Sequence, residues 1–152
     1  MAETNFEDED LDYREVVEEV LENHDLRYHS KVNDNKVFFS LSFNAKNLPS
    51  LDLFLTVTTK GDAKITCYLV RDIVPQKRAA VINAINNLNN SYRYITLSLD
   101  SDGDLLAQYD FTIFGDEEVA DKQVITMIFL VREIMDECFP KIMKAIWRDD
   151  DE

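Results

Sequence analysis

Three aspartates stand at alternate positions around a glycine in Asp100-Ser101-Asp102-Gly103-Asp104, and carboxylates in such a pattern are typical Ca²⁺ ligands. An EF-hand loop needs oxygen donors at positions 1, 3 and 5, glycine at position 6 and glutamate at position 12. Counted from Asp100, the glycine comes at position 4 and Phe111 stands at position 12. The flanking residues alternate as strands do, and Asp-Gly between such runs is typical of a β-hairpin. The segment is therefore predicted to be a turn.

The other residue types that carry chemistry lack a productive spacing. The two histidines, His24 and His29, have no cysteine or paired carboxylate at metal-ligand spacing. Ser30 follows His29 directly, and neighbours on a strand point to opposite faces, so they cannot act as nucleophile and base. Each of the three glycines is isolated, which excludes a phosphate-cradling loop. We expect no catalytic, metal-binding or cofactor-binding residues and no cofactor, and therefore not an enzyme.

The negative charge is concentrated at the two ends of the chain. The net charge of the 152 residues is −14, and residues 1–25 hold eleven acidic residues and one basic residue. Residues 149–152 are all acidic, while residues 26–148 carry equal numbers of both signs. This acidity repels phosphate backbones and argues against binding to nucleic acid. It is typical of a solubilising surface, or of an acidic arm that docks on a basic partner.

Targeting signals and cysteine usage favour the cytoplasm. The acidic N-terminus lacks the apolar stretch of a signal peptide, and the longest near-continuous apolar run, residues 124–131, is short of the about 20 residues that span a bilayer. Cys67 and Cys138 lie far apart in apolar patterns, which predicts buried free thiols in a reducing compartment. We expect a cytoplasmic protein without a membrane span.

The hydrophobic periodicity predicts an α+β domain with an antiparallel sheet of about six strands, in the order α-β4-α-β2-α. Helical spacing begins at Tyr13, Pro75 opens a second helix, and a third helix runs from about residue 116 to residue 147. Period-two alternation predicts strands at 26–32, 37–43, 51–57, 65–69, 95–99 and 105–113. We expect an acidic flexible tail over residues 1–11, one domain over residues 12–148 and an acidic tail over residues 149–152.

The last helix presents apolar residues beyond its core face. Val124, Ile128 and Val131 fall on one side of a helical wheel, as an ordinary core face does. Ile125 and Phe129 lie on one flank of this face, and Leu130 lies on the other. These three residues need a second cover, either from the sheet or from another chain, and we take them as candidate protein contacts. Pro140 is expected to kink or interrupt the helix.

An asparagine cluster marks the end of the second helix. Asparagine is a poor helix former in helix interiors but serves well at helix ends. The cluster is therefore either a self-capping end or a polar ladder that hydrogen-bonds another backbone. It comprises Asn83, Asn86, Asn87, Asn89 and Asn90, of which Asn86, Asn87 and Asn90 are spaced to share one side.

The chain resembles the YbjN domain family over most of residues 13–146. The resemblance rests on "VLENHDLRYHS", on "VPQKRAAVINAINNLNNSYRYITLSLDSDGDL" and on "MDECFPKIM". It implies a compact α+β domain, often dimeric, without an established enzymatic activity, whose fold is similar to that of type III secretion chaperones. No client-binding residue is carried over, because none can be matched position by position.

Together these patterns predict a non-enzymatic, protein-binding module, chaperone-like or regulatory, that forms a homodimer. Its sheet and last helix would offer apolar grooves to an extended or partly folded segment of an unknown partner or client. The alternative is a small-molecule-binding sensory domain with an internal pocket lined by aromatic residues such as Phe38, Phe54, Tyr68 and Tyr109.

Overall fold

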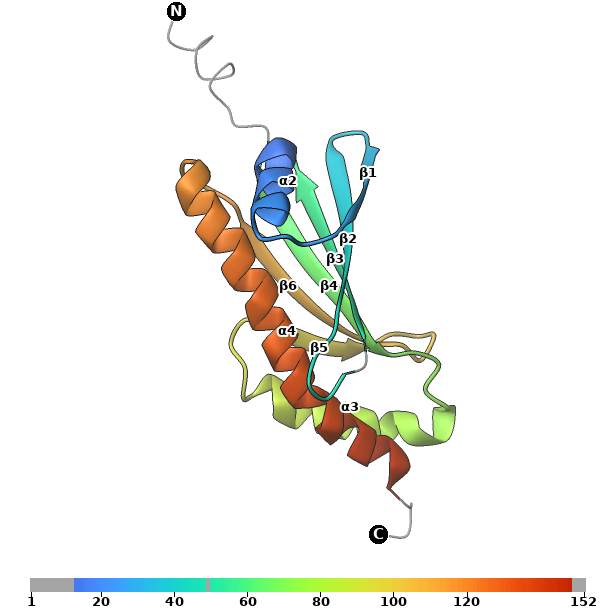
Figure 1. The fold of residues 1–152 in the computed structure, drawn as a ribbon. Coiled ribbons are helices and arrows are strands. Elements are labelled where there is room, and N and C mark those ends of the chain that lie inside the picture. Colours follow the sequence, from blue (N-terminus) through green and yellow to red (C-terminus); the bar gives the residue numbers. More distant parts are fainter. Residues whose placement is uncertain (1–12, 49, 149–152) are drawn as a thin grey trace, which may run out of the picture.

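The computed structural model describes residues 13–48 and 50–148, and this part of the chain forms three helices and a six-stranded antiparallel sheet (Figure 1). In chain order the elements are α2 (Tyr13–Asn23), β1 (His29–Asn33), β2 (Lys36–Phe43), β3 (Leu51–Thr58), β4 (Asp62–Val70), α3 (Pro75–Asn89), β5 (Thr96–Leu99), β6 (Leu105–Thr112) and α4 (Glu117–Trp147). The strand order in the sheet is β1-β2-β3-β4-β6-β5. The α+β class and the order α-β4-α-β2-α are confirmed; the acidic tails lie outside the described residues.

The sheet forms because apolar residues alternate along its strands in register with one another. In β2, β3 and the first part of β4 every second residue is buried. The pairing brings Leu41 opposite Leu53, and Leu55 opposite both Phe39 and Ile65. Because a shift by one residue would turn these side chains to the other face, their burial fixes the register.

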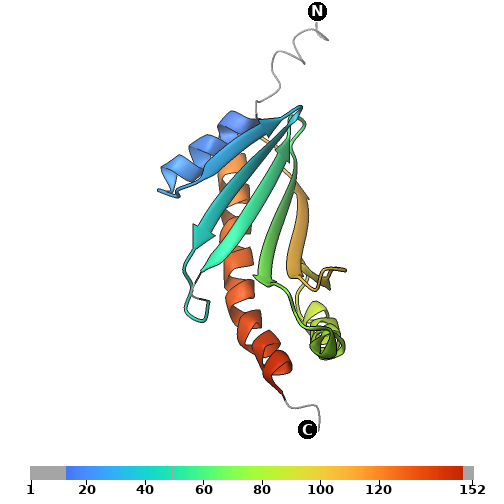
Figure 2. The same cartoon turned by 90° about the vertical axis from the view of Figure 1, so that its right-hand side faces the viewer.

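The described helices cover one face of the sheet, so the domain has two layers (Figure 2). α4 runs along this face, α2 packs beside its first half, and α3 lies at the other end of the molecule (Figure 1). Val17 of α2 and Ile128 and Met135 of α4 are fully buried against the sheet. Each such side chain stabilises the fold by about 1.5–3 kcal/mol.

The first strand begins later than the sequence predicts, at His29 rather than at Leu26. α2 ends in a Schellman motif, in which Leu26 N–H donates to Leu21 O at 2.8 Å and Asp25 N–H donates to Glu22 O at 3.1 Å. Asp25 adopts the left-handed conformation that this motif requires, with φ 57°. The hydrogen bond to Leu21 ties Leu26 to the helix end and delays the strand.

The prediction that Pro140 interrupts the last helix is wrong, because α4 continues through this residue. Asp116 caps the start of the helix, where its carboxylate accepts a hydrogen bond from Val119 N–H at 3.0 Å. Pro140 has no N–H to donate to the carbonyl four residues earlier, at Asp136. The Asn47 side chain donates to that carbonyl at 3.3 Å instead. A loop distant in sequence therefore supplies the hydrogen bond that proline removes.

The described part of the chain contains no helix that is both long enough and apolar enough to cross a membrane. Cys67 and Cys138 are buried and not joined to each other, as predicted. Burial raises the pKa of the Cys67 thiol to about 12 and also raises the pKa of Cys138. Both side chains are therefore protonated at neutral pH and behave as core residues.

Candidate functional site

The aspartate-rich segment is a hairpin turn closed by one of its own carboxylates. It joins β5 to β6, which pair antiparallel, as the sequence predicts. Asp100 Oδ1 accepts hydrogen bonds from Asp102 N–H at 3.0 Å and from Asp104 N–H at 2.9 Å. The backbone closes the same turn, with Gly103 N–H donating to Asp100 O at 3.1 Å. The Asp100 carboxylate thus satisfies backbone donors of its own loop.

The same turn is tied to the segment between β4 and α3. Asp104 Oδ1 accepts from Asp72 N–H at 2.9 Å, and Asp104 Oδ2 lies 3.8 Å from the Arg71 guanidinium. Ile73 N–H donates to Gly103 O at 2.8 Å. No group of three or more His, Cys, Asp or Glu side chains within the described ranges is arranged to hold a metal ion. The carboxylates act as structural acceptors in this turn.

Asp100→Ala is expected to lower the free energy of unfolding by about 1–3 kcal/mol, because it removes the acceptor for two backbone N–H groups. The loss will be the same in Ca²⁺ and in EDTA, because Asp100 stabilises the turn directly. Urea denaturation of both proteins in both buffers measures this. A loss seen in Ca²⁺ alone would contradict the structural role and restore the metal-site interpretation.

The three residues proposed as protein contacts differ in exposure. Ile125 and Leu130 are half-buried and pack against the core. Phe129 is 38% exposed, and its ring meets Phe43 of β2 edge to face, with centroids 6.3 Å apart. The sheet therefore covers one side of Phe129 and leaves the rest to solvent. Contact of these residues with a partner stays a prediction.

Phe129 lines a surface cleft of about 380 Å³ between α4 and the loop after β2. Ala45 and Lys46 of the loop form one wall, and Arg132, Glu133 and Asp136 continue the α4 wall. Hydrogen bonds to α4 hold the loop in place: Arg132 donates to Asn44 O at 3.1 Å, Asp136 Oδ1 accepts from Asn47 N–H at 2.6 Å, and Asp136 O accepts from the Asn47 side chain at 3.3 Å. The cleft therefore combines one aromatic surface with charges of both signs.

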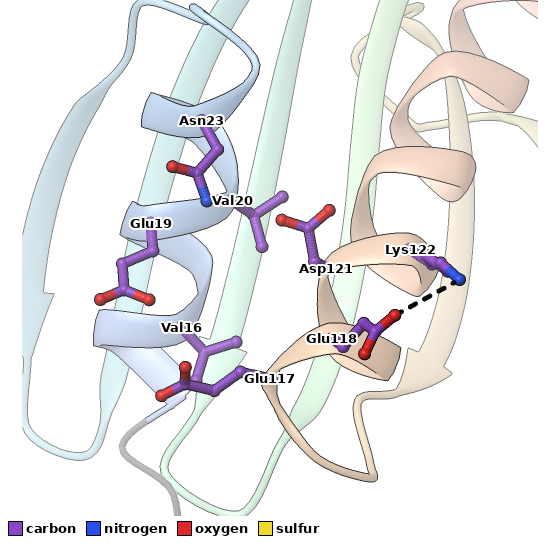
Figure 3. Close-up of a pocket in the computed structure, with 8 residues that line it drawn as sticks. All are labelled: Val16, Glu19, Val20, Asn23, Glu117, Glu118, Asp121 and Lys122. Carbon is purple, nitrogen blue, oxygen red and sulfur yellow. Dashed lines mark ion pairs between the residues drawn. The ribbon is translucent and has the colours of Figure 1, made fainter.

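A second cleft of about 260 Å³ lies between α2 and the start of α4 (Figure 3). Carboxylates from both helices line it, and Lys122 forms an ion pair with Glu118 at 3.8 Å. At the end of α2, His24 Nε2 lies 3.1 Å from Asp121 Oδ1. Its lining comprises Val16, Glu19, Val20, Asn23, Glu117, Glu118, Asp121 and Lys122. The acidic lining disfavours phosphate and carboxylate ligands.

The sheet face opposite the described helices carries a group of aromatic side chains. Phe38 is 40% exposed and Phe54 is 37% exposed. Phe54 meets Tyr68 edge to face, with ring centroids 6.3 Å apart, and the Arg71 guanidinium lies 3.9 Å from the Tyr68 ring centroid. We call Phe38, Phe54 and Tyr68 the aromatic face.

Uncharged polar residues separate these rings. Thr56 stands opposite Phe38, while Ser40 and Thr66 stand opposite Phe54. Leu106 of β6 stands opposite Tyr68 and extends the apolar area. Charged residues border this area: Lys31 of β1 stands opposite Phe38, Arg71 lies over Tyr68, and Lys64 of β4 faces Asp110 of β6 at 3.9 Å. An apolar centre with a polar rim is the usual composition of a protein-binding surface.

The aromatic residues expected to line one internal pocket do not converge, which corrects that expectation. Phe54 pairs with Thr66, whereas Tyr109 pairs with Ile65, so Phe54 and Tyr109 point to opposite faces of the sheet. Tyr109 instead packs against Phe111 and Tyr94, with ring centroids 5.5 Å and 5.7 Å away. The sequence held the signal, because Tyr109 alternates in phase with the buried residues of β6.

The asparagine cluster divides into one structural residue and four exposed ones. Asn89 accepts from Leu97 N–H at 2.8 Å and donates to Leu97 O at 3.0 Å, which fixes α3 to β5. Asn89 thus hydrogen-bonds the backbone of β5, which belongs to the same chain. The exposed residues are Asn83, Asn86, Asn87 and Asn90.

These features define a two-layer α+β domain whose exposed surfaces are aromatic on one side and acidic at one end. The chain belongs to the YbjN family, because the family model described as "Putative bacterial sensory transduction regulator" matches residues 13–143. The chain is also similar to the solved structure titled "Crystal structure of YbjN, a putative transcription regulator from E. coli". That similarity has a TM-score of 0.53 at 11% identity, and covers 86% of this chain and 89% of that one.

A comparison with curated proteins gives no match. At 11% identity, the solved structure bears on the fold alone. The resemblance to the YbjN family is confirmed. The likeness to type III secretion chaperones and the division into tails and one domain stay predictions.

Proposed function

We propose that this chain is a non-enzymatic regulatory module of the cytoplasm that binds an extended or partly folded segment of another protein and acts as a homodimer. One observation carries this proposal: the aromatic face, which no described helix covers and where Phe38 and Phe54 are more than a third exposed. Exposed aromatic side chains gathered on one sheet face are typical of binding surfaces. The family description as a regulator supports the same class of function.

A polypeptide segment fits this surface better than other ligands do. The aromatic face is broad and open, whereas small-molecule sites are concave and largely enclosed. The net charge of −14 disfavours nucleic acid. Ile125, Phe129 and Leu130 form a second proposed contact, where the cleft beside Phe129 receives an apolar side chain of the same partner. A chaperone-like role would consist of shielding such a segment until it folds.

Photo-crosslinking followed by affinity measurement tests this function. A benzophenone amino acid at position 54 is expected to capture a partner in the native cells, while the same amino acid at Phe114, which is 60% exposed outside the aromatic face, will not. With the purified partner, Phe54→Asp is expected to weaken binding at least about 10-fold in calorimetry, because it removes a central aromatic contact. Phe129→Asp tests the second contact in the same way.

Two outcomes would overturn the function. One is equal capture at positions 54 and 114, which marks non-specific contact. The other is an unchanged affinity in both Phe54→Asp and Phe129→Asp, which places the binding surface elsewhere. Both substituted side chains are partly exposed, so circular dichroism spectra matching the unmodified chain will show that the fold is retained.

A further inference from the structure

The two edges of the sheet differ in how their outward backbone groups are satisfied. β5 forms one edge, where the Asn89 side chain hydrogen-bonds Leu97 N–H at 2.8 Å and Leu97 O at 3.0 Å. β1 forms the other edge, and all five of its residues are exposed (Figure 1). An open edge strand presents unpaired N–H and C=O groups with which another chain can pair.

The register of the β1–β2 hairpin identifies the free groups of this edge. Asn33 and Lys36 are paired across a two-residue turn, and the residues that flank such a turn exchange both backbone hydrogen bonds. Because bonded and non-bonded pairs alternate along an antiparallel ladder, Lys31 is bonded to β2, while Ser30 and Val32 direct N–H and C=O outward. In the described part of the chain, no side chain caps these outward groups.

The two faces of β1 differ in their chemistry. Ser30 and Val32 stand opposite buried residues of β2, so their side chains lie on the face of the sheet that the helices cover. At the edge of this face Val32 is still 48% exposed. Lys31 lies on the other face and stands opposite Phe38 of the aromatic face. A strand added to β1 therefore places alternate side chains beside Val32 and beside Lys31.

The charge around this edge is opposite in sign to that of the whole chain. Residues 26–36 hold three basic residues and one acidic residue, in a protein of net charge −14. Within the described ranges, Arg27, Lys31 and Lys36 form no ion pair. A lysine on an edge strand opposes pairing with a second copy, because it brings like charges together, but it attracts acidic side chains. Charge therefore favours an acidic segment of a different protein.

A surface cleft of about 830 Å³ adjoins the start of β1 and is lined in part by Ser30. Leu26 and Tyr28 give the cleft an apolar lining, and Arg27 gives it a basic group. The one carboxylate in its lining, that of Glu22, accepts a hydrogen bond from the Tyr28 hydroxyl at 3.1 Å. The cleft therefore gives room to a segment that extends beyond the strand, and it combines apolar and basic groups as the edge does.

We infer that β1 receives an extended segment of a partner protein as an additional, antiparallel strand. The segment alternates apolar residues, which pack beside Val32, with acidic residues, which face Lys31. The antiparallel direction follows the sheet, in which every neighbouring pair of strands is antiparallel. The inference rests on the proposed function in taking the ligand to be an extended segment, and it specifies the chemistry of that segment.

Calorimetry with two synthetic peptides tests the chemistry of the segment on the full chain. The first probe is Val-Glu-Val-Glu-Val-Glu-Val with blocked ends, and the second carries lysine in place of each glutamate. The glutamate probe is expected to bind at least about 10-fold more tightly, because its acidic side chains face Lys31. The net charge of −14 alone favours the lysine probe, so this order of affinities reports the local contact.

A charge reversal on β1 identifies the residue responsible. Lys31→Glu is expected to abolish the preference for the glutamate probe. Lys122→Glu is the matched control, since it makes the same change of net charge on α4, where the Lys122 side chain is 78% exposed. This variant is expected to retain the preference.

N-methylated probes test the strand pairing without altering the protein. In an antiparallel ladder, the residues bonded to Ser30 and Val32 stand directly opposite them and carry their side chains on the same face, which assigns these positions to the valines. N-methylation of the valines removes the N–H groups that donate to β1 and is expected to abolish binding. N-methylation of the glutamates is expected to be tolerated, because their N–H groups point away from β1.

Amide hydrogen exchange locates the bound probe. A saturating concentration of the glutamate probe is expected to slow exchange of Ser30 N–H and Val32 N–H at least about 10-fold, because both gain an acceptor. Exchange of Lys31 N–H is expected to change far less, since this group is already bonded to β2.

The outcomes separate this inference from the proposed function. A lysine probe that binds as tightly as the glutamate probe, equal binding of the two N-methylated probes, or unchanged exchange at Ser30 and Val32 would each overturn strand addition at β1. Protection of these two groups that rises with protein concentration in the absence of a probe would also overturn it, and would assign the edge to a second copy. None of these results alters crosslinking at position 54, which tests the aromatic face.

Discussion

Gly103→Ala is expected to lower the free energy of unfolding by about 2–4 kcal/mol. Gly103 has φ +86°, and the left-handed region costs a residue with a Cβ roughly 1–2 kcal/mol. A Cβ placed there would also lie 2.8 Å from Ile73 O and 2.5 Å from Arg78 Nη2. The Ile73 carbonyl is backbone and is fixed by a hydrogen bond from Arg78 Nε at 3.0 Å, so it cannot move away cheaply.

Gly115→Ala is the matched control for this prediction. Gly115 has nearly the same φ, +87°, but its Cβ would meet the side chain of Val119, with Cγ1 at 2.9 Å. Val119 is 44% exposed and has room to change rotamer, so about 1–2 kcal/mol is expected, mostly from backbone strain. Urea denaturation measures both variants. Equal losses would show that the contact with Ile73 adds nothing to the strain.

The turn around Gly103 shows which local features can be predicted from sequence. The position of the glycine relative to the aspartates, and the alternation on both sides, were sufficient to predict a hairpin turn. The packing of that turn on Ile73 and Arg78 was not predictable, because these residues stand 30 and 25 positions before Gly103 in the chain. Local patterns specify local hydrogen bonds, whereas tertiary contacts depend on how the elements assemble.

The aromatic face was partly predictable for the same reason. Alternation in each strand separates Phe54 from the core residues of β3 and Tyr68 from those of β4. Joining them into one surface requires the β3–β4 register, which sets Phe54 beside Tyr68. The placement of β6 beside β4 rather than at the sheet edge is a matter of topology. Single-strand periodicity does not contain that information. The pocket proposed with Tyr109 was wrong for another reason: Tyr109 alternates in phase with the buried residues of β6 and so points to the face opposite Phe54.

Pro140→Ala is expected to raise the free energy of unfolding by about 1–2 kcal/mol. A proline inside a helix costs roughly 3 kcal/mol relative to alanine. Part of this gain is offset, because alanine increases the conformational freedom of the unfolded chain by about 0.4–1 kcal/mol. The restored N–H of residue 140 also competes with Asn47 for the Asp136 carbonyl, to which Asn47 donates at 3.3 Å. Urea denaturation measures the net change.

Asn47→Ala in both backgrounds separates these contributions. With Pro140 present, the variant leaves the Asp136 carbonyl without the Asn47 donor and is expected to cost about 1 kcal/mol. With Pro140→Ala present, the helix supplies its own donor, so the loss is expected to fall well below that value. The difference between the two losses is the coupling energy between residues 47 and 140.

A coupling energy near zero would mean that Asn47 does not compensate for the proline, and that α4 tolerates Pro140 through its core packing alone. A positive coupling instead gives Pro140 a role in positioning the loop after β2. The carbonyl that proline frees becomes an acceptor for this loop, and the Asp136 carboxylate adds a second contact through Asn47 N–H. The wall of the cleft beside Phe129 is then set by a helix residue that was expected from the sequence to kink or interrupt the helix. Pro140→Ala is therefore expected to loosen Lys46 and Asn47, which faster amide hydrogen exchange in that loop would show while α4 itself becomes more stable.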